Sequence, residues 1–150
     1  MSLEKWAEYG WLKAEPTSRD EIKSLLAIVD RDLKDASVVG VSEDRRFEAA
    51  FSAARTAATI ALRASGYRTS TQAGHHVKTM ESLEFTIKAD SKLIQRMKTL
   101  SKKRNATSYD SAGNVSTQEL ELATKTATEL RRTVIAWLEK NHPELLKDRT

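Results

Sequence analysis

Arg104 is the residue of this 150-residue chain whose type and position point most clearly to chemistry. It follows Leu93, Met97 and Leu100, which are spaced by four and three residues and therefore share one face of a helix. The next position on that apolar face is Arg104, so its guanidinium is aimed at the interior of a bundle or at a groove beside it. Because an unpaired charge is expensive to bury, Arg104 requires an acidic partner, a backbone carbonyl or an anionic ligand.

Further polar side chains surround Arg104 in the sequence. They are Lys102, Lys103, Asn105, Tyr109 and Asp110. Asn105 and Tyr109 lie four residues apart, so they share an adjoining helix face and predict a polar, ligand-binding cluster near the helix end. The same pattern also fits a structural ion pair between Arg104 and a carboxylate of the N-terminal helices, with the two lysines as a solvated helix end.

Two adjacent histidines, His75 and His76, are accessory candidates for proton transfer. They fall at a predicted helix start, where the positive end of the helix dipole disfavours imidazolium and lowers the pKa. A neutral imidazole near Arg104 could act as a base, but histidines at a helix start are more often capping or turn residues, and no spacing places these two against Arg104. His142 is remote, and no His, Asp or Glu spacing resembles a metal-ligand set, so we expect no metal and no cofactor.

The elements that must position these residues are predicted to be helices. Serine or aspartate caps and glycine or proline stops delimit them, and the expected ranges are 18–37, 42–66, 75–87, 90–109 and 116–142, preceded by a short docking helix or turn over 3–13. The second range carries a stripe of alanines that could face a neighbouring helix or a dimer partner. No segment alternates convincingly enough to predict a strand, and a polar loop is expected over 67–74. The fold class is therefore all-α, an antiparallel four-helix-type bundle with additional short helices, in one domain over residues 1–150.

Composition restricts the class of protein further. There is no cysteine, so disulfides and thiolate metal sites are excluded. No stretch approaches the length of an apolar membrane span, which favours a cytoplasmic protein that does not enter membranes. The net charge of +4 is compatible with a phosphate-bearing partner but does not decide for one.

The segment KKRNATSYD, residues 102–110, resembles the arginine-centred motif of the HEPN superfamily, in which a histidine follows the arginine by four to six residues. The stretch SEDRRFEAAFSAARTAATIALRASGYR, residues 42–68, followed by GHH at 74–76, resembles a bacterial subgroup of that superfamily. The two stretches together span most of the predicted core, from Ser42 to Asp110.

The resemblance implies a homodimer in which two arginine segments meet in a cleft. In HEPN ribonucleases the arginine stabilises charge on the phosphorane and the histidine moves protons, without a metal. Here Arg104 and Asn105 match, but Tyr109 takes the place of the histidine, and a phenol that titrates near pH 10 is a poor base at pH 7.

We therefore expect a nucleotide-, RNA- or partner-binding module rather than an efficient ribonuclease. Two alternatives stay open. The first is a metal-independent endoribonuclease of a toxin–antitoxin or defence system, in which Arg104 and Tyr109 would be catalytic. The second is a structural partner of a nucleotidyltransferase or an antitoxin.

Overall fold

A computed structural model describes residues 1–71, 74–109 and 113–146, and the side chains of all of these except 106–109. The described chain is built almost entirely of helices. They are α1 (Leu3–Glu8), α2 (Arg19–Ala36), α3 (Glu43–Ala64), α4 (His75–Glu81), α5 (Ser91–Tyr109) and α6 (Thr117–Asn141), with 3-10 helices η1 (Ser82–Glu84) and η2 (Pro143–Leu145). The predicted all-α class is confirmed.

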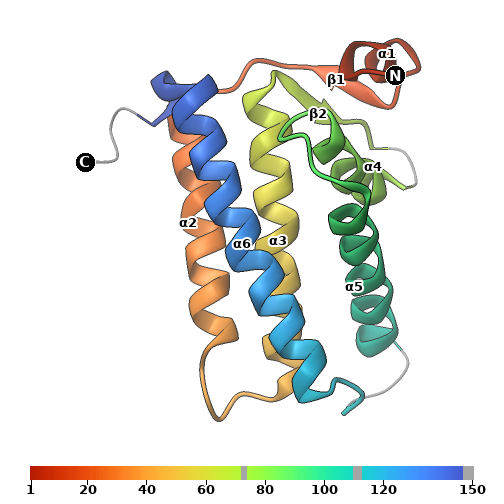
Figure 1. The fold of residues 1–150 in the computed structure, drawn as a ribbon, viewed down its shortest axis with the longest axis vertical. Coiled ribbons are helices and arrows are strands. Elements are labelled where there is room, and N and C mark those ends of the chain that lie inside the picture. The colour runs from red at the N-terminus through yellow and green to blue at the C-terminus, as the bar shows by residue number, and fades with distance from the viewer. Residues whose placement is uncertain (72–73, 110–112, 147–150) are drawn as a thin grey trace.

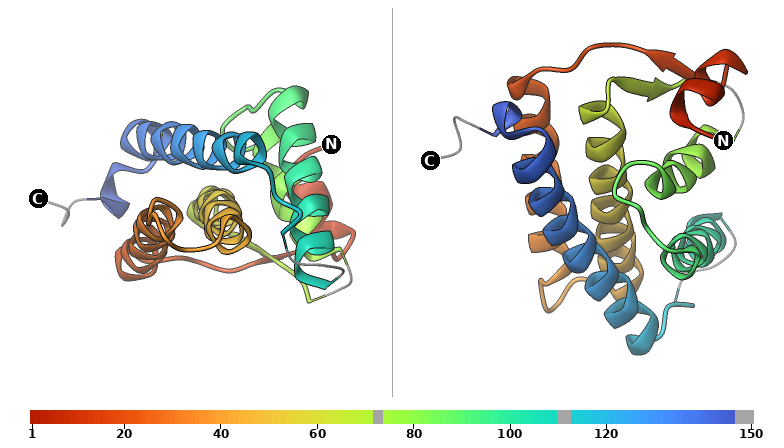
Figure 2. Two further views of the ribbon diagram at one scale, coloured as in Figure 1. Left: turned by 90° about the horizontal axis from the view of Figure 1, so that it is seen from below. Right: turned by 45° about the horizontal axis from the view of Figure 1, so that its top comes forward.

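The four long helices α2, α3, α5 and α6 form an antiparallel bundle, with successive long helices running in opposite directions (Figure 1). Helix α3 is central and packs against α2, α4, α5 and α6. The view along the bundle shows α2 and α6 on one side of α3 and α5 on the other (Figure 2). No helix in the described ranges is both long enough and apolar enough to cross a membrane.

The alanine stripe of α3 is buried within the chain. Its fully or nearly fully buried alanines are Ala50, Ala53, Ala54, Ala57, Ala58, Ala61 and Ala64. Small side chains on a central helix allow its neighbours to approach closely, and larger side chains such as Phe47, Ile60 and Met97 fill the remaining space. Of the two readings of this stripe, the structure therefore supports packing against helices of the same chain.

The helix starts follow the predicted capping chemistry. The box at Ser116 is complete, because its hydroxyl accepts from the Glu119 N–H at 3.1 Å and the Glu119 carboxylate accepts from the Ser116 N–H at 2.9 Å. Two further predicted caps form, at Ser42 and Asp90. At Ser18 only half of the box forms, because the Glu21 carboxylate binds Arg63 instead.

Two short strands were not predicted, and the expectation of no strand is wrong for them. Strand β1 (Leu12–Ala14) pairs antiparallel with β2 (Tyr67–Thr69), with Leu12 opposite Thr69. The helix expected over residues 3–13 accordingly ends at Glu8, and the expected 67–74 loop begins with a strand. Three residues are too few to show an alternating pattern, so periodicity cannot detect them.

The helix beginning at His75 is also shorter than predicted. It ends at Glu81, and η1 follows. The Ser82 hydroxyl donates to the Thr79 carbonyl at 2.6 Å where the chain tightens into this 3-10 turn. Val77 on this helix is 40% exposed.

Arg63 fastens the N-terminal segment to the bundle. Its side chain is buried near the end of α3 and donates to the backbone carbonyls of Glu15, Pro16 and Tyr67, each at 3.1 Å. Its Nη2 also lies 2.8 Å from Oε1 of Glu21 on α2. A buried guanidinium with this many partners is a structural element of the fold.

Candidate functional site

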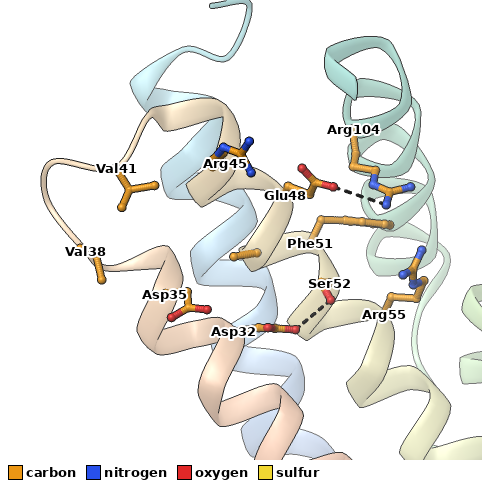
Figure 3. Close-up of a pocket in the computed structure, with 11 residues that line it drawn as sticks. Asp32, Asp35, Val38, Val41, Arg45, Glu48, Phe51, Ser52, Arg55 and Arg104 are labelled. Carbon is orange, nitrogen blue, oxygen red and sulfur yellow. Dashed lines mark hydrogen bonds and ion pairs between the residues drawn. The ribbon is translucent and has the colours of Figure 1, made fainter. Parts of the chain in front are cut away.

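Arg104 lies where its helical spacing predicted, one turn beyond the buried Met97 and Leu100. Its side chain is partly buried and lines a hollow of about 480 Å³ between α2, α3 and α5 (Figure 3). The other charged or polar side chains of this hollow are Asp32 and Asp35 from α2, and Arg45, Glu48, Ser52 and Arg55 from α3. The guanidinium is therefore directed into a groove, one of the two predicted positions.

Two weak partners hold Arg104. Its Nη2 lies 3.7 Å from Oε1 of Glu48, and its Nη1 donates to Oδ1 of Asn105 at 3.5 Å. Both separations are at the long end for an ion pair and a hydrogen bond, and about half of the Glu48 side chain is exposed. The predicted pairing with a carboxylate thus exists, but within the described chain it leaves most donors of the guanidinium available.

Arg55 lies on the same α3 face as Glu48 and Ser52, and the sequence did not single it out. Its Cζ is 5.9 Å from the Phe51 ring centroid, and no carboxylate of the described chain forms an ion pair with it. Burial lowers the pKa of Arg55, and the nearby charge of Arg104 lowers this pKa further. Arg55 and Arg104 therefore face one hollow, and of the two only Arg104 has an ion pair in the described chain, the long one with Glu48.

The acidic side of the hollow does not neutralise Arg55. Asp32 is 5% exposed, and its two oxygens are already engaged. Oδ2 accepts from the Ser52 hydroxyl at 2.8 Å, and Oδ1 accepts from Nε of Arg31 at 3.0 Å. Asp32 is close enough to raise the pKa of Arg55 but forms no ion pair with it. The two oxygens of Asp32 are therefore engaged with Ser52 and Arg31, and Arg55 forms no ion pair within the described chain.

His76 lies on α4, which packs against both α3 and α5. Burial lowers the pKa of His76, and the charges of Arg55, His75 and Arg104 lower it further. These interactions place the imidazole within electrostatic range of both arginines, which no sequence spacing indicated. The His75 ring centroid is 3.9 Å from that of His76.

The other predicted site residues are distributed differently. Lys102 is exposed, whereas Nζ of Lys103 lies 3.4 Å from Oε2 of Glu119 on α6 and so joins two helices. The side chain of Tyr109 and all of Asp110 lie outside the described residues. The structure thus brings together Arg104, Asn105 and His76 of the predicted set and adds Arg55, Ser52 and Asp32.

One signal in the sequence could have identified Arg55. It interrupts the alanine stripe between Ala54 and Ala57, on the helix most heavily buried in the core. A long cationic side chain in such a helix needs either solvent or a counter-charge. The hollow gives Arg55 partial access to solvent, but no carboxylate in the described part of the chain forms an ion pair with Arg55.

Helix α5 is strongly basic. Its six basic residues are Lys92, Arg96, Lys98, Lys102, Lys103 and Arg104, and it has no acidic residue. The rest of the chain then carries nineteen basic and twenty-one acidic side chains. The positive net charge of the protein is therefore concentrated on the helix that supplies Arg104.

Within residues 1–71, 74–109 and 113–146, no group of three or more His, Cys, Asp or Glu side chains could hold a metal ion. Comparison of the chain with protein-family models, with curated proteins and with solved structures returns no match. The HEPN resemblance therefore rests on the motifs themselves.

Proposed function

We propose that this protein is a HEPN-like binding module that holds the phosphate groups of a nucleotide or RNA in the hollow between α3 and α5. The observation that carries the proposal is Arg55, a half-buried guanidinium that faces Arg104 and forms no ion pair within the described chain. The two nearby positive charges repel each other. An anion bound between them would attract both and so offset this repulsion.

The chemistry of the groups favours phosphate. Guanidinium groups present planar pairs of N–H donors that match phosphate oxygens. The basic surface of α5 adds positive potential around the same hollow. A phosphate seated between Arg55 and Arg104 would compete with the long Glu48 contact, whereas Asp32 is already engaged.

The test is titration of the purified protein with a labelled single-stranded RNA oligonucleotide and with a nucleoside monophosphate. Arg55→Gln and Arg104→Gln are each expected to weaken both ligands by about tenfold or more, because a hydrogen bond to a charged group contributes roughly 1.5–3 kcal/mol. Arg132→Gln, which removes an exposed arginine of α6, is the matched control and should change affinity little.

Thermal unfolding of the same variants separates binding from a structural role. If Arg55 serves a ligand, Arg55→Gln should leave the melting temperature unchanged or raise it, because the variant removes a half-buried like charge. A large fall in melting temperature, or RNA binding by Arg55→Gln equal to that of the wild type, would contradict the proposal.

A second candidate function, metal-independent RNA cleavage, is favoured by His76. An imidazole whose pKa is lowered is neutral at pH 7, and a neutral imidazole can accept a proton from a ribose hydroxyl. His76 could therefore supply the base that Tyr109 does not. The homodimer implied by the HEPN resemblance stays a prediction for either function.

Incubation with labelled RNA in the presence of chelator decides between the two functions. For a binding module we expect no cleavage above the level of Arg104→Ala. Cleavage that is lost in both Arg104→Ala and His76→Gln would replace the binding module with a ribonuclease. Cleavage that persists in Tyr109→Phe would then exclude the tyrosine from that mechanism.

A further inference from the structure

A second hollow, of about 540 Å³, lies between the N-terminal segment and the α4, η1 and α5 helices. It shares no lining residue with the Arg55–Arg104 hollow. Its volume falls within the range of small-molecule sites, and its walls combine aromatic rings with a few charged groups. It is therefore a candidate for a separate ligand.

Three aromatic rings line this hollow. Trp6 meets Trp11 edge to face, with ring centroids 5.9 Å apart and an interplanar angle of 69°. Trp6 also meets Phe85 edge to face, at 5.1 Å and 89°. Trp6 is buried, and edge-to-face contacts of this kind fix the relative orientation of the rings. The wall is therefore preformed.

The ammonium group of Lys78 occupies this wall. Its Nζ is 3.9 Å from the Trp11 ring centroid and 4.8 Å from the Trp6 ring centroid. The same Nζ lies 3.5 Å from Oε1 of Glu81. Two indole faces and a carboxylate around one cation make an aromatic cage, here filled by a lysine of the protein itself.

Lys78 can leave the cage at small cost. Its side chain is 30% exposed and stands on a flexible stem, so it can rotate into solvent. Glu81 would keep a partner, because its Oε2 lies 2.8 Å from Nζ of Lys98. Without Lys78, the hollow retains the carboxylates of Glu81 and Glu84 beside the ammonium of Lys98.

We propose that this aromatic cage binds a small quaternary ammonium compound in exchange for the Lys78 ammonium. A quaternary ammonium has no N–H to hydrate, so it gives up less hydration than lysine on contact with the Trp6 and Trp11 faces. Its methyl groups also fill the space between the rings, and its positive charge faces the carboxylates of Glu81 and Glu84. The cage is independent of the phosphate site.

Calorimetric titration with choline chloride, against sodium chloride at equal ionic strength, tests the exchange. The uncharged carbon isostere of choline, with a tert-butyl group in place of the trimethylammonium, is the control ligand. Choline is expected to bind, and the isostere is not, because only the cation interacts with the electron-rich ring faces. Equal binding of the two ligands would overturn the proposal.

Variants of the cage give a second, independent result. Lys78→Ala removes the internal competitor and is expected to tighten choline binding by about threefold or more, whereas Trp11→Leu weakens it by about tenfold. Trp137→Leu, on α6 outside the cage, is the control and leaves affinity unchanged. If Trp11→Leu does not fold, Lys78→Ala decides. Two outcomes would disprove the exchange. One is that Lys78→Ala binds choline no more tightly than the wild type, and the other is that neither protein binds choline.

Discussion

Arg55 and His76 are the two residues that most change the interpretation of the site. Neither belongs to the segment around Arg104, and they come from different helices, α3 and α4. Their shared property is electrostatic, since each has a pKa lowered first by burial and then by charges from the same cluster. At this scale the site combines two guanidinium groups with an imidazole whose positive charge they disfavour.

The pKa of His76 predicts a pH dependence of RNA binding. Below about pH 6.5 the imidazole begins to protonate and adds a third positive charge beside the two arginines. We expect RNA affinity to rise by about threefold or more as the pH falls from above 6.5 through the lowered pKa of His76, since the phosphodiesters do not titrate there. His76→Gln should bind with a flat pH profile, which fluorescence anisotropy at constant ionic strength can measure.

The stability of the free protein should change in the opposite direction. Because the pKa of His76 is lower in the folded state than in the unfolded state, the unfolded chain binds more protons between the two values. The free energy of unfolding therefore falls as the pH falls through this window, and His76→Gln should weaken that trend. Identical pH profiles of wild type and His76→Gln, in both measurements, would remove His76 from the cluster.

At the scale of the elements, α6 depends on its first turn. The capping box of Ser116 and Glu119 satisfies two backbone N–H groups, and the backbone N–H of Ser116 holds the pKa of Glu119 below its ordinary value. Lys103 of α5 also reaches Glu119, so the same carboxylate links the helix start to the basic helix.

Ser116→Ala is expected to lower the free energy of unfolding by about 1 kcal/mol, the usual loss for a serine cap. Thr128→Ala, at an exposed position within the same helix, is the control and should change stability by less than about 0.5 kcal/mol. Urea denaturation measures both. Similar losses in the two variants would show that the cap contributes nothing specific.

The long helices could be predicted because their apolar residues recur with helical spacing and their caps are chemically distinctive. Arg104 could be placed for the same reason, since it continues the face of Met97 and Leu100. Strands β1 and β2 could not, because three residues show no period. The position of His76 near Arg55 depends on how α4 packs against α3 and α5. The spacing of residues along one helix does not predict how that helix packs against others.

At the scale of the whole molecule, the N-terminal segment and the bundle are two packed bodies that meet at Leu62 and Arg63 of α3. Trp6, Leu12 and Leu62 form a small apolar cluster separate from the main core. Arg63 connects the two, because it binds the 15–16 backbone, the Tyr67 carbonyl and Glu21 at once.

Arg63→Met is therefore expected to destabilise the protein by about 3 kcal/mol, the lower end for breaking a buried ion pair, since Glu21 is partly exposed. Arg68→Met is the control, because Arg68 pairs with Glu15 at the surface and should contribute less than about 1 kcal/mol. Chemical denaturation gives both values. Equal effects of the two substitutions would mean that Arg63 does not join the two bodies.

The uneven charge of α5 has a consequence for how the molecule moves before it binds anything. With six positive charges on one helix and a slight negative excess in the rest of the sequence, the positive charge of the protein is weighted toward α5. In the field of a polyanion the protein turns this helix forward while it diffuses, so encounters begin with the face that carries Arg104. The association rate should then fall steeply as salt is added.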